Sequence, residues 1–89
     1  MSARMYDDFM LLERKDQEAV LAFEENVVEW SDDQLRLELS AIRPAFQLLC
    51  TLAIEESEPS ERMRLVYHSR RIDLQKTIME NEIVRRELR

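Results

Sequence analysis

The residue types that most often carry out chemistry in proteins are scarce in this sequence. Cys50 is the only cysteine and His68 is the only histidine. A single thiol cannot close an intrachain disulfide, and one thiol with one imidazole falls short of the ligand set of a zinc site. Cys50 lies among leucines, as is typical of a buried, inert thiol. No neighbour of His68 is identified as the group that would orient it as a general base. We therefore predict no catalytic residue, no metal site and no bound cofactor.

Glycine is absent from the sequence altogether. Phosphate-binding loops and nucleophile elbows depend on glycine for close backbone approach or for strained turns. The remaining composition is rich in Leu, Glu, Arg, Ala, Met and Gln, which are good helix formers. These observations make an enzyme the least favoured class and predict an all-α protein.

Three charged residues interrupt apolar helix faces. Glu13 and Glu24 lie within the apolar arc of the first predicted helix, and Arg70 lies within the larger apolar face of the last. In one interpretation all three side chains extend outward to water. In the other they form ion pairs between helices or across a dimer, which would specify register more than it would add stability. Both interpretations stay open at this point.

Cap signals divide the sequence into three helices. Ser31 is followed three residues later by Gln34, which is the pattern of a capping box. Ser57 precedes Pro59, and proline is tolerated in the first turn of a helix. The predicted fold is an antiparallel three-helix bundle in a single all-α domain, residues 1–89, with helices over residues 4–29, 32–56 and 59–88.

The middle helix, residues 32–56, is apolar around most of its circumference. This pattern predicts burial on several sides and a place at the core of the assembly. Pro44 interrupts the helix by removing a backbone hydrogen bond and crowding the preceding turn. We predict a kink at Pro44, with a complete break into two helices as the alternative.

The last helix carries apolar residues on two nearly opposite sides. Met63, Tyr67, Leu74 and Ile78 belong to one side, and a single neighbouring layer cannot cover both. An apolar face without a neighbour usually marks an interface. We therefore predict a homodimer, with the other two helices covering one face each as the alternative. The predicted dimer or partner interface consists of Leu65, Ile72, Met79, Ile83, Arg64 and Arg71.

Charge is distributed unevenly along the chain. Residues 1–61 hold five Lys and Arg against fifteen acids, a net charge of −10, and residues 62–89 hold eight against four, a net charge of +4, which together give −6. In the first interpretation the basic helix packs on the acidic ones and the charges neutralise each other. In the second, the Arg-rich helix contacts nucleic acid phosphates or an acidic protein. In the third, the acidic half imitates nucleic acid.

These features favour a non-catalytic protein–protein interaction module: a homodimeric adaptor, small chaperone or inhibitor of a larger protein. The alternatives are a nucleic-acid-binding regulator that uses the Arg-rich C-terminal helix and an acidic inhibitor that mimics nucleic acid. The start of the sequence is acidic and lacks the apolar run of a signal peptide. The longest apolar stretch, roughly residues 45–54, is shorter than the ~20 residues of a bilayer span. We expect a cytoplasmic protein without a membrane or small-molecule substrate as partner.

Overall fold

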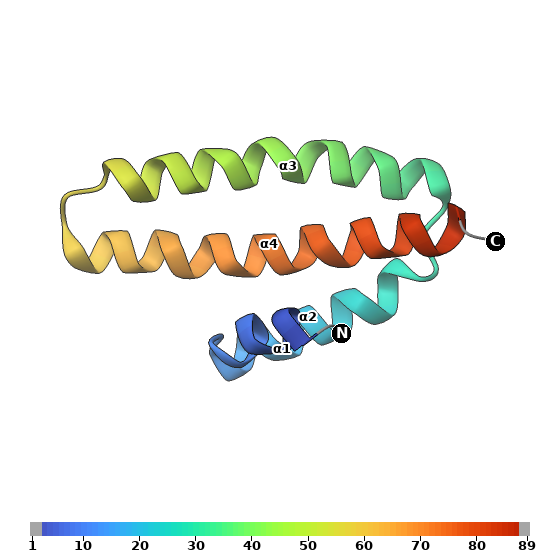
Figure 1. Ribbon diagram of the computed structural model, residues 1–89, viewed down its shortest axis with the longest axis horizontal. Coiled ribbons are helices and arrows are strands. Elements are labelled where there is room, and N and C mark those ends of the chain that lie inside the picture. Colours follow the sequence, from blue (N-terminus) through green and yellow to red (C-terminus); the bar gives the residue numbers. More distant parts are fainter. Residues whose placement is uncertain (1–2, 88–89) are drawn as a thin grey trace.

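The computed structural model describes residues 3–87, and these residues form four helices without a strand (Figure 1). The all-α prediction is confirmed. The helices are α1 (Ala3–Met10), α2 (Arg14–Val27), α3 (Asp32–Glu55) and α4 (Pro59–Glu87). The prediction of three helices is therefore wrong in number, because the first predicted helix is divided in two.

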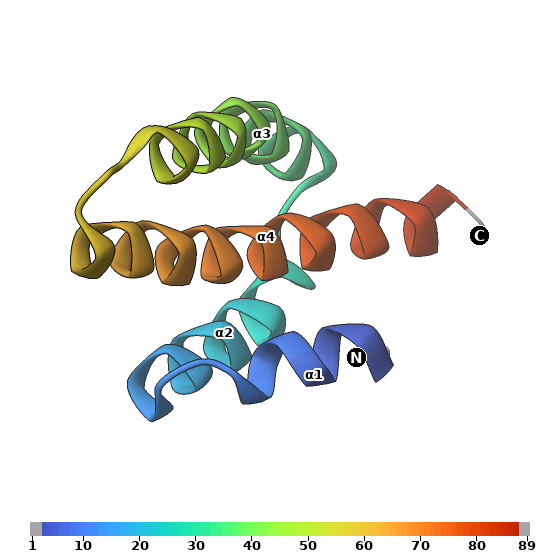
Figure 2. The same cartoon turned by 60° about the vertical axis from the view of Figure 1, so that its left-hand side comes forward.

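The division falls at residues 11–13, where the chain turns back so that both α1 and α2 contact α4 (Figures 1 and 2). The side-chain amide of Gln17 donates to the carbonyl oxygens of Phe9 and Leu12, each at 3.2 Å. The Leu12 carbonyl thereby gains a partner just beyond the end of α1, and the Phe9 carbonyl, which also accepts from the backbone N–H of Leu12 at 3.1 Å, gains a second. The turn also lets both Met5 and Leu12 enter the buried core. Tertiary burial therefore overrides a helical pattern that continues through the turn.

The alternative of a complete break at Pro44 is wrong, because α3 runs from Asp32 to Glu55 as one helix with Pro44 inside it. The proline ring removes the partner of the Ser40 carbonyl. Both Ser40 and Pro44 are exposed, so water can take the place of the missing backbone donor.

The caps of the two long helices follow the predicted positions closely. Ser31 accepts a hydrogen bond from the backbone N–H of Gln34 at 3.1 Å, so the predicted cap of α3 is confirmed. At α4 the capping side chain is Glu58 instead of the predicted Ser57. The Glu58 carboxylate accepts from the backbone N–H groups of Ser60 and Glu61 at 3.2 and 2.8 Å. These bonds, together with one from the Ser60 hydroxyl, lower the pKa of Glu58, the hydroxyl being the strongest cause.

The central element is α4, which lies between α3 on one side and α1 with α2 on the other (Figure 2). The most apolar helix, α3, is not buried on several sides within the chain, contrary to the prediction, whereas its place at the core of an assembly stays a prediction. The reason is that α4 has two opposite apolar faces and the other helices of the chain cover one face each. The core on both sides of α4 consists of Met5, Leu12, Val20, Val27, Leu35, Leu39, Leu74, Ile78 and Met79.

Candidate interaction surface

The inner and outer faces of α3 are both apolar, but the described residues cover only the inner face. Leu35, Leu39 and Ala53 are buried against the rest of the chain. On the opposite side, Leu37, Leu48 and Leu52 have 67%, 59% and 42% of their surface exposed. We call these three leucines, together with the exposed Ala41 and Ala45, the outer stripe of α3. Their spacing of three or four residues places them along one side of the helix.

Neutral residues border the outer stripe on one edge. The hydroxyl of Ser40 donates to the carbonyl of Leu37 at 2.7 Å, and the hydroxyl of Thr51 donates to the carbonyl of Gln47 at 3.1 Å. These hydroxyl protons are already bonded within the helix, so a surface packed over them would not leave them without an acceptor. A partner surface could therefore cover this edge of the outer stripe without leaving a hydroxyl group unbonded.

The predicted interface on α4 is occupied by α3 of the same chain. Met79 is only 1% exposed and belongs to the core. Leu65, Ile72 and Ile83 are half-buried, and Ile83 packs against the core cluster. The argument that one layer cannot cover both faces of α4 holds, but α3 supplies the second layer. The reason for placing a dimer interface on these residues is therefore removed, and the uncovered apolar face lies on α3.

The two arginines of that predicted interface have partners within the chain. Arg64 bonds to Glu61, one turn earlier on α4, at 2.9 Å. Arg71 forms an ion pair with Asp16 of α2 at 3.6 Å and approaches Nδ1 of His68 at 3.1 Å. Of these contacts, the Arg71–Asp16 pair connects the basic helix α4 to α2, and the other two lie within α4 itself.

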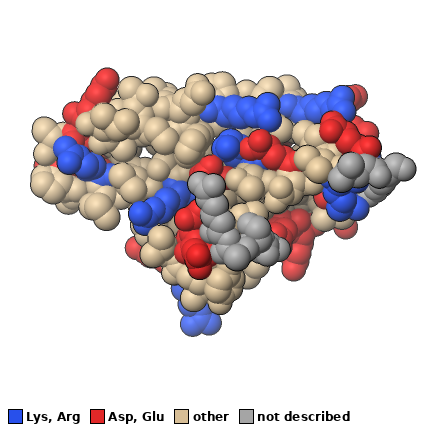
Figure 3. All heavy atoms as spheres, viewed as in Figure 1, with Lys and Arg blue, Asp and Glu red and all other residues tan. Residues whose placement is uncertain are grey.

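Lys76 is also held by its own chain. It lies 3.2 Å from Glu80 and 3.6 Å from Asp73, both on α4. Its ammonium lies 5.4 Å from the centre of the Phe46 ring of α3, in cation–π range. Arg43 of α3 reaches Glu80 at 3.5 Å. Acidic and basic side chains are accordingly interleaved over the face seen in Figure 3, as mutual neutralisation requires.

The strongest polar cluster centres on Glu82, and it was not singled out from the sequence. Glu82 is 7% exposed and accepts hydrogen bonds from both Arg85 and Arg86. The bonds from Arg85 first, and then from Arg86, lower the pKa of Glu82 to about 2 against the opposing effect of burial. The spacing of three and four residues on one helix was the available signal.

Arg86 also joins α4 to the chain between α2 and α3. Its guanidinium bonds to Asp32 at 2.7 Å and to the carbonyl oxygens of Val27, Val28 and Trp30 at 3.3, 3.3 and 2.7 Å. These carbonyls lie at or just beyond the end of α2, where helical partners run out. A basic side chain at a helix C-terminus also interacts favourably with the helix dipole.

The three interrupting charges do not meet one another in the described part of the chain. Glu13 is exposed and pairs with Lys15, two residues along, at 3.8 Å. Glu24 and Arg70 are half-buried, and neither forms an ion pair within residues 3–87. Arg70 acts only at longer range, where its charge opposes the rise in the pKa of Tyr67.

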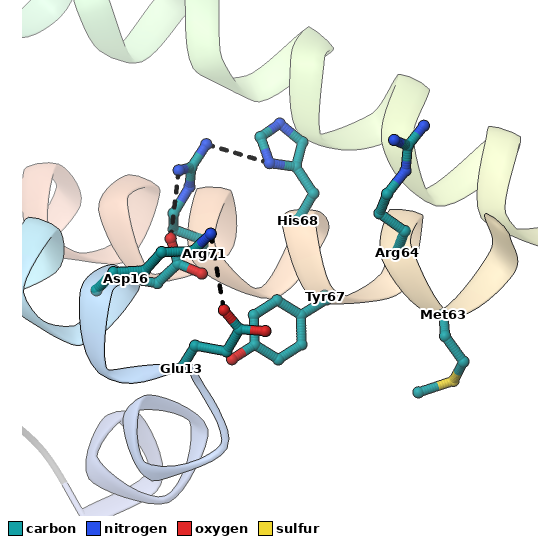
Figure 4. A pocket seen from close by; sticks show the side chains of 8 residues that line it. Glu13, Asp16, Met63, Arg64, Tyr67, His68 and Arg71 are labelled. Carbon is teal, nitrogen blue, oxygen red and sulfur yellow. Dashed lines mark hydrogen bonds and ion pairs between the residues drawn. The ribbon is translucent and has the colours of Figure 1, made fainter. Parts of the chain in front are cut away.

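A pocket of about 550 Å³ lies where the start of α2 meets α4 (Figure 4). It is lined by Glu13, Lys15, Asp16, Met63, Arg64, Tyr67, His68 and Arg71. His68 is exposed at its edge, and Cys50 lies elsewhere, half-buried on α3. Among the described residues, no group of three or more His, Cys, Asp or Glu side chains is arranged to hold a metal ion.

Comparisons of the chain with protein-family models, with curated proteins and with solved structures find no match.

By length and composition α3 could cross a membrane, although no single apolar run in the sequence reaches that length. The core helices of soluble proteins share these properties, but only 11% of the apolar window of α3 is buried within the chain. The exposure of α3, rather than its length, is the feature that calls for a partner surface.

Proposed function

We propose that the protein is a non-catalytic protein–protein interaction module that acts as a homodimer through the outer stripe of α3. One observation carries this proposal: the most apolar helix of the chain has a neighbour on its inner side only. Contiguous exposed apolar surface of this kind is typical of an interface.

The free energy that would be gained by burying the leucines of the outer stripe favours a partner surface over it. Complete burial of a leucine side chain stabilises by roughly 1.5–3 kcal/mol. Leu37, Leu48 and Leu52 each keep at least 42% of their surface in water. Covering them would therefore add several kcal/mol, which is a large share of the ~5–15 kcal/mol that stabilises an ordinary domain.

A second copy of the chain fits the stripe by symmetry. Ala41 and Ala45 lie near its middle, with leucines toward both ends. When two α3 helices cross antiparallel about an axis between these alanines, Ala41 of one faces Ala45 of the other and Leu37 faces Leu48. Small side chains let the helix axes approach to about 8 Å. Closed twofold dimers are also the commonest form of oligomer.

The contacts of the basic residues weigh against the nucleic-acid alternative. Most Lys and Arg side chains of α4 bond to carboxylates of the same chain, including Arg64, Arg71, Lys76, Arg85 and Arg86. Binding to phosphates would have to compete with these pairs and with a net charge of −6. We therefore expect no submicromolar binding to random duplex DNA at physiological salt.

The double substitution L37E/L48E tests the proposal, and I54E provides a matched control. Ile54 is 81% exposed on α3 but lies on the edge away from the outer stripe. Light scattering should give twice the chain mass of 10.7 kDa for the wild type and for I54E, and the single mass for L37E/L48E. Circular dichroism should show that all three proteins keep their helices.

Two results would count against the dimer. One is a wild-type protein that stays monomeric at high micromolar concentration, in which case the stripe is free for a helix of a different protein. The other is dissociation of I54E to the same extent as L37E/L48E, which would place the interface elsewhere.

A further inference from the structure

Two exposed apolar residues lie on the same side of α2. Leu21 and Val28 have 46% and 55% of their surface exposed. They are seven residues apart, and Val28 keeps helical backbone angles just after the last residue of α2, so their side chains point in nearly the same direction. Glu24 lies between them on that side, three residues after Leu21 and four before Val28. We call Leu21, Glu24 and Val28 the α2 edge.

A hollow of about 210 Å³ lies beside the α2 edge, where α1, α2 and α4 meet. Glu24 lines it together with apolar side chains from all three helices, which are Met5, Val27, Val28 and Ile78. Its volume is below the ~300 Å³ at which small-molecule sites begin. The hollow therefore has the size to take one side chain of a partner rather than a free ligand.

The charges at the hollow favour a cationic side chain. Glu24 is half-buried and has no hydrogen bond or ion pair among residues 3–87. Glu82 and Arg85 also line the hollow, but they neutralise each other through two hydrogen bonds. The carboxylate of Glu24 is the charge that is left over. A lysine or arginine matches this site, because its methylene stem can lie on apolar surface while its charged end stays at the rim.

The chain around the α2 edge is acidic and lacks basic residues. Residues 16–35 hold seven Asp and Glu and no Lys or Arg. Three of these acids form ion pairs with arginines of the chain. The other four form none among the described residues, and they are Glu24, Glu25, Glu29 and Asp33. This remaining negative charge attracts and orients a positively charged partner surface.

We propose that the α2 edge docks a basic amphipathic helix of another protein. Apolar side chains of that helix cover Leu21 and Val28, and one of its lysines or arginines enters the hollow beside Glu24. An amphipathic helix presents such anchors at spacings of three, four and seven residues. The proposal extends the interaction module by a second surface. Because α2 and α3 lie on opposite sides of α4, its failure would leave the proposed dimer untouched (Figure 2).

Titration with synthetic peptides provides the test. The probe is an amphipathic helix of leucine and lysine with about 14 residues, which is the length of α2. We expect saturable binding with a micromolar dissociation constant. A peptide with glutamate in place of lysine should bind at least tenfold more weakly, and so should a peptide of the same composition whose leucines do not share one side. Equal binding of either control peptide, or no saturable binding of the probe at millimolar concentration, would overturn the proposal.

Nuclear magnetic resonance shows where the peptide binds. The largest changes are expected in the backbone amide signals of residues 21–28 and in the methyl signal of Met5. The signals of Leu37 and Leu48 on the outer stripe should change little. Largest changes on the outer stripe would mean that the peptide covers α3 instead, which contradicts the proposal.

Matched substitutions test the apolar part of the α2 edge. L21S/V28S removes two exposed apolar side chains and should raise the dissociation constant of the probe at least tenfold. I54S/M63S makes the same change at two exposed apolar residues elsewhere and should leave the constant unchanged. Circular dichroism checks that both proteins keep their helices. Unchanged binding by L21S/V28S, or an equal loss in I54S/M63S, would show that the α2 edge is not the site.

The charge at the hollow has its own pair of variants, which also decides the question if L21S/V28S does not fold. E24Q keeps the shape of the side chain and should weaken the probe at least threefold. E38Q, the same change at an exposed glutamate of α3, should leave binding unchanged. Equal affinities of E24Q and the wild type would contradict the entry of a cationic side chain beside Glu24.

Discussion

The helices α3 and α4 pack along each other, and the more apolar of the two is the less covered. α3 has one neighbour and keeps a row of leucines in water, whereas the charge-rich α4 is covered on two sides. Two arrangements within α4 account for this difference. Its apolar residues fall in two opposite sectors, and most of its basic side chains find carboxylates on α4 itself or on α2 and α3.

This contrast shows what decides burial in a small helical chain. The number of apolar residues on a helix matters less than whether its polar residues can be satisfied once neighbours cover it. The charges of α4 lie at the margins of its two contacts, where ion pairs can form. α3 carries fewer charged residues than α4, but residues 3–87 contain no further helix that covers its outer side.

The largest expected effect on the free energy of unfolding comes from truncating an inner apolar residue, and truncating an outer one provides the comparison. Met79 is 1% exposed between α3 and α4, whereas Leu48 is 59% exposed on the outer stripe. M79A should lower the free energy of unfolding by about 3 kcal/mol, because it leaves a cavity in the core. L48A should lower it by about 1 kcal/mol or less when the protein is dilute. Urea denaturation at low micromolar protein provides both values.

The same two variants can also contradict the claim that the outer side of α3 is uncovered in the monomer. If L48A destabilises dilute protein as much as M79A does, the outer side of α3 is covered within the monomer and the proposed interface is lost. If the loss of unfolding free energy in L48A grows with protein concentration while that in M79A does not, a second copy of the chain covers the outer stripe.

The sequence predicted the local features of the fold better than the arrangement of its helices. The start of α3 was predictable because Ser31 and Gln34 are three residues apart, a local pattern that needs no tertiary contact. At α4 the predicted cap, Ser57, was wrong, because the carboxylate of the next residue, Glu58, accepts the hydrogen bonds of the first turn. The break before Glu13 could not be predicted, because no glycine or proline marks it.

The sequence predicted an uncovered apolar helix face, but it placed this face on the last helix, α4, instead of on α3. Two apolar sides on α4 and a nearly all-apolar α3 are visible from helical periodicity. Which of these sides the chain covers by itself depends on contacts between residues far apart in sequence, such as Arg86 with Asp32. The pocket was missed for the same reason, since the start of α2 and the middle of α4 meet only in the folded chain.

The next largest expected effect on stability comes from the polar cluster around Glu82, whose charges are paired where other helices pack on α4. E82Q keeps the shape of the buried side chain but removes the charge that Arg85 and Arg86 share. We expect a loss of about 2 kcal/mol, as for hydrogen bonds between charged groups. Thermal or urea unfolding measures it. A change below about 0.5 kcal/mol would show that the remaining partners of Arg86, namely Asp32 and the carbonyls after α2, suffice.

Glu82 also predicts how stability depends on pH. Its pKa falls from 4.5 to about 2 in the folded chain, so its contribution is present above pH 4.5 and is lost as the pH falls toward 2. The stability of the wild type should therefore decline more steeply in this window than that of E82Q. Glu29 is exposed just after α2, so E29Q, the same change at an exposed glutamate, is the matched control. Identical profiles for E82Q and the wild type would remove Glu82 as the cause.

The smallest expected effect is that of Arg70, the one arginine placed within the apolar face of α4. It is half-buried and has no ion pair in residues 3–87, so R70A should change the free energy of unfolding by no more than about 0.5 kcal/mol. R86A is the contrasting variant, because Arg86 holds Glu82, Asp32 and three carbonyls, and its removal should be several times more damaging. The same urea denaturation series measures both. A loss of 3–5 kcal/mol in R70A would mean that Arg70 pairs with Glu13 or Glu24 after all. Since no such pair exists within one chain, the partner carboxylate would then have to come from a second copy that contacts α4 as well as α3.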